Sequence, residues 1–235
     1  MDLSLPRIEH RVDRLIAKTG LAVAQLVYGE RCAERVFSKI GCRNPFSRLG
    51  AGSNRTQTAV IRREIPALVE QLGVRSVLDI PCGDFWWMRE TQLPEIVTYI
   101  GADSAADLID SNTRQYGNQR RSFRKLDLME DVLPAADLVL CRDCLVRLSF
   151  DDIDRAIVNL KRSGSTYLLT TSFTGQSRKN TDIVTGQWRT LNLSKGPFFF
   201  PQPLYMLNEQ STERNGAFRD KSLALYRIAE LPVRS

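Results

Sequence analysis

The sequence predicts an α/β protein whose doubly wound, Rossmann-like sheet is mostly parallel and has an antiparallel final strand. Short apolar runs rich in β-branched residues recur after residue 75, and most are separated by polar or helix-length stretches, as in parallel strands buried on both faces. Two further runs, at 204–207 and 222–228, could complete the sheet, and a hairpin joining them would be antiparallel. The five runs expected to form parallel strands cover residues 76–80, 98–102, 122–126, 138–141 and 166–171.

Two segments before the first expected strand carry apolar residues at helical spacing. In the first, Ile8, Val12 and Leu15 lie at such intervals, which predicts an N-terminal helical extension over residues 1–49. A second helix is expected directly before the first strand. We therefore divide the chain into this extension and one domain over residues 50–235.

The composition is that of an ordinary globular protein, because 43% of the residues are apolar and 26% are charged. No apolar run approaches the roughly 20 residues that a membrane-spanning helix needs, and the N-terminus does not resemble a secretory signal. The net charge of +6 could suit nucleic acid, but the basic residues are scattered and form no binding tail. We expect a cytoplasmic protein without a membrane partner and assign no oligomeric state.

The five cysteines are odd in number and scattered, although Cys141 and Cys144 form a C-x-x-C pair. This pair could form half of a zinc site, but the chain has no second pair of ligands to complete it. The only histidine, His10, lies far away in the sequence. As a redox pair it lacks the preceding turn of thioredoxin-like proteins. We expect reduced thiols and no metal site.

The strongest functional signal follows the first expected strand, where Asp79 leads into a tight turn that contains Gly83. In open α/β sheets, ligands bind beyond the carboxyl ends of the strands, and a glycine lets a ligand approach the backbone closely. The turn lacks the glycines of a dinucleotide fingerprint, and no P-loop occurs in the chain. Because Asp79 would repel a pyrophosphate, a cationic ligand such as S-adenosylmethionine (SAM) suits this turn better.

From Asp79 onward, ten residues read D-I-P-C-G-D-F-W-W-M. This string resembles motif I of the class I SAM-dependent methyltransferases, and specifically a bacterial subgroup that carries D-x-P-C-G-D-F-x-W-M. The common motif has three glycines, at positions that Pro81, Gly83 and Phe85 occupy in this chain. The resemblance covers roughly residues 50–230 and implies SAM as the cofactor and S-adenosylhomocysteine as its product.

Two further acidic residues end expected strands in the order that this family shows. Asp103 ends the second strand, where a carboxylate can accept hydrogen bonds from both ribose hydroxyls. Asp127 follows the third, where the resemblance implies a contact with the adenine amino group. Each also has a structural explanation, a helix N-cap for Asp103 and a turn for Asp127. The expected cofactor-binding residues are Asp79, Pro81, Cys82, Gly83, Asp103, Ser104, Asp127, Leu128 and Arg142.

The fourth expected strand leads into R-D-C-L-V-R-L-S, where the subgroup usually reads R-D-x-x-x-H-L-S. Arg147 therefore replaces a histidine, and an arginine stays protonated and cannot serve as a general base. Either Asp143 is the base, or the acceptor ionises easily and Arg147 or Arg142 holds its negative charge. Loss of activity and a purely structural Arg142–Asp143 ion pair are the alternatives. The candidate catalytic residues are Asp143, Arg142 and Arg147.

Residues 174–203 are too rich in proline to form regular secondary structure. They are also too rich in aromatic residues for a solvent-exposed loop without a packing or binding role. In the family that this sequence resembles, loops in this position commonly cover the methyl acceptor. The candidate acceptor-binding residues are Trp188, Arg189, Asn192 and Phe198. A flap that only packs on the sheet edge is the alternative. Before the core, the loop at Gly52 is expected to clamp the methionine end of the cofactor.

Together these residues predict a SAM-dependent methyltransferase that acts on the oxygen of a small molecule or sugar. A second hypothesis is an RNA or protein methyltransferase, which the positive charge favours, although the chain has no N-P-P-Y signature and no appended RNA-binding module. The third is a SAM-binding protein without catalysis, because of Arg147. A fold alone does not decide among them.

Overall fold

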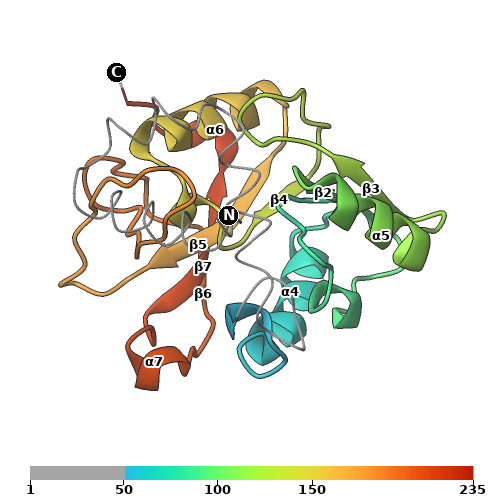
Figure 1. The fold of residues 1–235 in the computed structure, drawn as a ribbon, viewed down its shortest axis with the longest axis horizontal. Coiled ribbons are helices and arrows are strands. Elements are labelled where there is room, and N and C mark those ends of the chain that lie inside the picture. Colours follow the sequence, from blue (N-terminus) through green and yellow to red (C-terminus); the bar gives the residue numbers. More distant parts are fainter. Residues whose placement is uncertain (1–50, 235) are drawn as a thin grey trace, which may run out of the picture.

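The computed structural model describes residues 51–234, so the expected helical extension over residues 1–49 lies outside the described residues. Within them, seven strands form one sheet in the order β3-β2-β1-β4-β5-β7-β6 (Figure 1). The strands are β1 (Ser76–Asp79), β2 (Thr98–Asp103), β3 (Arg121–Lys125), β4 (Leu138–Cys141), β5 (Tyr167–Phe173), β6 (Tyr205–Asn208) and β7 (Lys221–Arg227).

The strands β1 to β5 are parallel, and β7 runs antiparallel to both of its neighbours, β5 and β6. This confirms the predicted doubly wound sheet, and each expected strand lies within two residues of its predicted bounds. Because β7 is antiparallel, its first residue, Lys221, pairs with Phe173 at the end of β5. The start of β7 therefore lies at the same edge of the sheet as the ends of the parallel strands.

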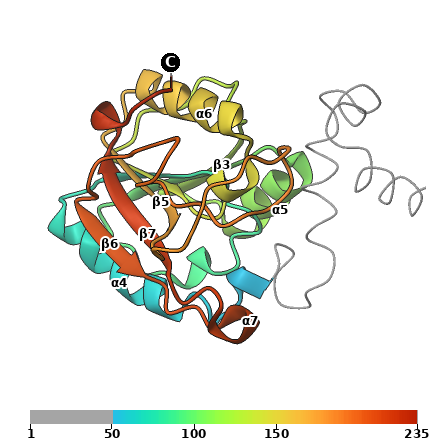
Figure 2. The ribbon, with the colours of Figure 1, turned by 90° about the vertical axis from the view of Figure 1, so that its left-hand side faces the viewer.

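Helices cover both faces of the sheet, and Figure 2 shows α6 (Phe150–Arg162) above the strands and α4 (Ala59–Gln71) below them. The helix α5 (Ala106–Tyr116) packs on the same face as α4. Helix α6 begins at Phe150 because the hydroxyl of Ser149 caps it by accepting a bond from the N–H of Asp152. Its inward side consists of Ile153, Ala156, Ile157 and Leu160.

The other helical elements are short. They are α7 (Glu213–Gly216) and the 3-10 turns η2 (Ala51–Ser53), η3 (Met88–Glu90), η4 (Leu145–Arg147) and η5 (Ile228–Glu230). Among residues 51–234, no helix is long and apolar enough to cross a membrane. In the same part of the chain, no group of three or more histidine, cysteine or acidic side chains is arranged to hold a metal ion.

Residues 174–203 form neither helix nor strand, as predicted, but they are well packed. Phe198 meets Phe150 edge to face at the start of α6, and Phe200 meets Tyr226 of β7 in the same way. These rings join the hydrophobic core on the α6 face of the sheet. The segment therefore covers part of this face of the sheet.

Candidate functional site

The turn after β1 is fastened to the end of β2 and to α5. Gly83 has a left-handed backbone with φ of +55°, which favours glycine. Its N–H donates to Oδ2 of Asp103 at 3.1 Å, and its carbonyl accepts a bond of 2.7 Å from Nδ2 of Asn112. The N–H of Cys82 donates to the carbonyl of Ala102 at 2.7 Å. The structure thus brings three of the expected cofactor-binding residues together at one edge of the sheet.

Asp103 is 8% exposed and joins this turn to α5. Its Oδ2 accepts the bond from Gly83, and its Oδ1 accepts one of 3.0 Å from the N–H of Ala105, where α5 begins. Burial raises the pKa of Asp103, and these backbone donors oppose the rise. Each carboxylate oxygen has two lone pairs, so both can accept further bonds from hydroxyl groups. Asp103 therefore has a structural role at the start of α5, and its oxygens can still accept further hydrogen bonds.

Asp79 ends the neighbouring strand and is 2% exposed. The hydroxyl of Tyr99 donates to its Oδ2 at 2.5 Å. Burial raises the pKa of Asp79 to about 7, the bond from Tyr99 opposes this, and the negative charge of Asp103 adds to it. Two buried carboxyl groups thus disfavour each other's ionisation, and a cation bound close to both would favour their charged forms.

Asp127 follows β3, the outer neighbour of β2, and is half-buried. Its Oδ1 accepts a bond of 2.8 Å from the N–H of Met129, and its own N–H donates to Oδ2 of Asp131 at 2.7 Å. Asp127 therefore begins a turn, as the structural explanation of this residue predicted. The next residue, Leu128, is buried, and its carbonyl accepts a bond from Asn159 of α6.

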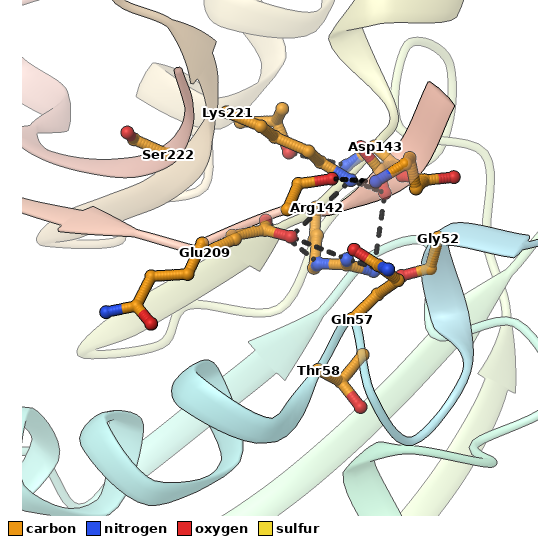
Figure 3. A network of polar contacts seen from close by, with 12 residues as sticks. Gly52, Gln57, Thr58, Arg142, Asp143, Glu209, Lys221 and Ser222 are labelled. Carbon is orange, nitrogen blue, oxygen red and sulfur yellow. Dashed lines mark hydrogen bonds and ion pairs between the residues drawn. The ribbon is translucent and has the colours of Figure 1, made fainter. Parts of the chain in front are cut away.

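A buried network of charges, which we call the edge network, joins Arg142, Asp143, Glu209 and Lys221 (Figure 3). Arg142 is 6% exposed, and its Nε and Nη2 donate to the two carboxylate oxygens of Glu209 at 3.1 and 2.7 Å. Nη2 also donates to the carbonyl of Gly52 at 2.7 Å. A bidentate pair of this kind fixes the orientation of the guanidinium.

Asp143 completes the edge network. Its Oδ2 accepts a bond of 2.7 Å from Nζ of Lys221 and lies 3.3 Å from Nη1 of Arg142. Its backbone is left-handed, with φ of +56°, and its N–H donates to the hydroxyl of Thr171 at 2.8 Å. Burial alone would raise the pKa of Asp143, but the charges of Lys221 and Arg142 outweigh it and hold the pKa at about 2. The structure therefore contains the Arg142–Asp143 ion pair that was one alternative.

Glu209 and Lys221 were not predicted as site residues. A signal exists, because the acidic residue Glu209 directly follows β6 and Lys221 begins β7. In the hairpin these residues face each other, and the N–H of Glu209 donates to the carbonyl of Lys221 at 3.0 Å. Reading that signal requires the hairpin register and the direction of β7 together.

The expected clamp loop lies against the edge network. A Cβ at Gly52 would stand 3.3 Å from Oε2 of Glu213 and 3.5 Å from Nζ of Lys221, so any larger residue would press on charged groups. Further along the loop, Nε2 of Gln57 donates to the hydroxyl of Thr212 at 2.7 Å, and the N–H of Thr212 donates back to Oε1 at 3.1 Å. The segment that leads into α4 is therefore fastened to the connection between β6 and β7.

Arg147, which stands in place of the histidine, is half-buried at the end of η4. Within residues 51–234 its guanidinium forms no hydrogen bond or ion pair, although it lies near enough to Asp143 for their charges to interact. Burial lowers the pKa of Arg147, and the charge of Asp143 opposes this. The segment 186–189 runs alongside η4, since the N–H of Gly186 donates to the carbonyl of Arg147 at 2.8 Å.

Trp188 and Arg189 lie on this segment beside η4. The ring of Trp188 is 38% exposed and packs against Phe173 and Phe218, with centroids 6.1 and 5.0 Å away. Arg189 is 7% exposed, and its Nη1 donates to the carbonyl of Leu145 at 3.3 Å. Its Nε and Nη2 are buried without a hydrogen-bond partner in the described part of the chain. Burial lowers the pKa of Arg189 to about 10.

Asn192 and Phe198 do not join Trp188 and Arg189 beside η4, because both are buried in the packed interior of residues 174–203. The N–H of Asn192 donates to Oδ1 of Asn180, and its own Oδ1 accepts a bond of 2.7 Å from the hydroxyl of Ser194. These contacts stabilise the loop. The structural alternative, a flap that packs on the sheet, describes this half of the segment.

Comparisons with known proteins bear on the fold. No family model matches the sequence, and no curated protein matches it. Human N-acetylserotonin methyltransferase, solved in complex with SAM, superimposes with a TM-score of 0.52 at 14% identity, over 72% of this chain and 52% of that one. The pyocyanin biosynthetic protein PhzM gives 0.52 at 13% identity, over 95% of this chain and 67% of that one. The chain thus spans about half the length of the first protein, and its fold is the Rossmann-like fold of SAM-dependent methyltransferases.

Proposed function

We propose that residues 50–235 form a SAM-binding domain that transfers the sulfonium methyl group to the oxygen of a small molecule or sugar. The observation that carries this proposal is the pair of buried carboxyl groups on Asp79 and Asp103, which end neighbouring strands and adjoin the turn at Gly83. Such a pair suits a cationic nucleoside at the carboxyl edge of the sheet. The likeness in fold to a protein that holds SAM supports the proposal.

Each strand end has its own part in this proposal. Asp103 accepts hydrogen bonds from the ribose hydroxyls, and Asp79 faces the positive charge of the methionine end. Asp127 accepts a bond from the adenine amino group. Gly83 has no side chain, so a ligand can approach the backbone of this turn closely. The other proposed cofactor contacts are Pro81, Cys82, Ser104, Leu128 and Arg142.

SAM supplies a methyl group that positively charged sulfur already activates. The chain's own task is to position the acceptor and to exclude water. We assign Asp143, Arg142 and Arg147 to the neighbourhood of the reacting oxygen. With a pKa of about 2, Asp143 is a weak base, so its contribution is to hold the charged groups around it in place.

The acceptor side of the site is proposed to lie beside η4. Trp188 offers an apolar surface, and Arg189 offers hydrogen-bond donors. Asn192 and Phe198 act indirectly, by shaping the loop that carries these two side chains.

A two-stage experiment tests the proposal. Thermal unfolding is first measured with and without SAM or S-adenosylhomocysteine, and we expect both to raise the midpoint. Mass spectrometry then follows methyl transfer from labelled SAM to fractions of a bacterial lysate. A labelled small molecule supports the proposal, and the absence of any thermal shift contradicts it. Binding without transfer to any fraction indicates a non-catalytic SAM-binding protein, and transfer that ribonuclease abolishes indicates an RNA methyltransferase.

A further inference from the structure

The carboxyl groups at the ends of β1 and β2 differ in how well the chain stabilises their negative charge. Asp103 accepts hydrogen bonds from the backbone N–H groups of Gly83 and Ala105. Asp79 is more deeply buried, with 2% of its surface exposed against 8% for Asp103, and it accepts a bond from the neutral hydroxyl of Tyr99. When two buried carboxylates repel each other, the less stabilised one keeps its proton to higher pH. Here that carboxyl group belongs to Asp79.

The groups that influence Asp79 lie on neighbouring elements, namely Tyr99 and Asp103 on β2, Cys82 in the turn after β1, and Arg142 after β4. Burial raises the pKa of Tyr99 and of Cys82 well above their usual ranges, so both stay neutral. Arg142 favours the ionised form of Asp79, but its guanidinium is held in the bidentate pair with Glu209. Burial outweighs the favourable contacts and raises the pKa of Asp79 to about 7. Asp79 therefore gains or loses its proton near neutral pH.

We propose that SAM binds to the ionised form of Asp79, so that binding expels the carboxyl proton and becomes tighter as the pH rises toward neutrality. This inference rests on the proposed function and adds a regulation of the same site. On binding, the O–H bond of the Asp79 carboxyl breaks, the proton passes to the solvent, and the carboxylate becomes a counter-ion of the bound cation. At a SAM concentration below saturation, methyl transfer should therefore slow as the pH falls below about 7.

Proton release by the unmodified full chain is the first test. SAM is titrated in by calorimetry at pH 6.5, once in phosphate and once in imidazole buffer, because the two buffers differ in their heats of ionisation and so reveal the protons exchanged. We expect about two-thirds of a proton to be released per SAM bound, and the affinity for SAM to be about tenfold weaker at pH 6 than at pH 7.5. Binding without proton release, or with equal affinity at the two pH values, overturns the inference.

Two variants show whether the proton comes from Asp79. Asp79→Asn cannot ionise, so it should bind SAM more weakly, release no proton and lose the dependence of affinity on pH. Tyr99→Phe removes the donor that favours the carboxylate, so its affinity should rise with pH over a range shifted upward. The matched control Asp110→Asn changes an exposed carboxylate of α5 and should behave like the unmodified chain. Titration of the ligand's own groups is common to every variant and cannot produce a difference among them.

Proton release that persists in Asp79→Asn overturns the inference. If this variant binds no SAM, Tyr99→Phe decides, because an unshifted pH profile overturns the inference and an upward shift supports it. If the unmodified chain binds no SAM at either pH, the proposed function fails first, so the two failures are distinguishable.

Discussion

Nζ of Lys221 lies 2.7 Å from Oδ2 of Asp143, so an ion pair joins the first residue of β7 to the residue that follows Arg142 after β4. The contact exists because β7 is antiparallel and starts at the edge where β4 ends. It places Lys221 beside Asp143, a carboxylate that the sequence alone made a candidate general base. The pair therefore makes Asp143 part of the scaffold of the site.

This ion pair predicts a pH dependence of stability. Asp143 has a pKa of about 2 in the folded chain, below its ordinary value of 3.8, so its contribution is fully present above about pH 4 and is lost as the pH falls toward 2. In urea unfolding between pH 2 and 7, Asp143→Asn should lower the free energy of unfolding near neutrality and flatten its acid limb. The control Asp110→Asn changes an exposed carboxylate of α5. Parallel curves for the unmodified chain and Asp143→Asn would show that the ion pair does not contribute.

The bidentate pair of Arg142 and Glu209 predicts strong non-additivity. Arg142→Met leaves Glu209 buried with fewer positive partners, which should lower the free energy of unfolding by about 3–5 kcal/mol. The double variant Arg142→Met/Glu209→Leu removes both charges and should recover most of that loss. Chemical denaturation of the two variants measures the difference. A double variant no more stable than the single one would contradict the assignment.

The buried carboxyl of Asp79 predicts that stability changes with pH in the opposite direction to that predicted for Asp143. The pKa of Asp79 rises to about 7 on folding, so the folded chain keeps a proton that the unfolded chain releases above about pH 4. Asp79 should therefore lower the free energy of unfolding progressively as the pH rises from about 4 to 7. Above about pH 7 this contribution should stay constant. Asp79→Asn should remove this slope, and Tyr99→Phe should extend it to higher pH because the opposing hydrogen bond is lost. If Asp79→Asn keeps the slope of the unmodified chain, the pKa of Asp79 is not raised.

The sheet was predictable from sequence because each strand is a short apolar run with its own local signal. The positions of Asp79 and Asp103 were predictable for the same reason, since each directly ends such a run, and their role toward a cofactor stays a prediction. The edge network was not, because its partners lie 67 and 78 residues apart and meet only through the direction of β7. Phe198 looked like an acceptor contact because aromatic side chains suit both a pocket wall and a core. Only the packing against α6 shows that it lies in the core.

We propose that Asp79 and Asp103 form the binding site of a cationic nucleoside at the carboxyl edge of the sheet. This site is tested by calorimetric titration of the full chain with SAM, with Asp103→Ala as the variant and Asp110→Ala as an exposed control on α5. We predict saturable binding of one SAM per chain, unchanged in the control and weakened about a hundredfold by Asp103→Ala, because a charge-assisted hydrogen bond to each ribose hydroxyl is lost. Equal affinity in Asp103→Ala and the unmodified chain, or no binding to the unmodified chain, would contradict the claim.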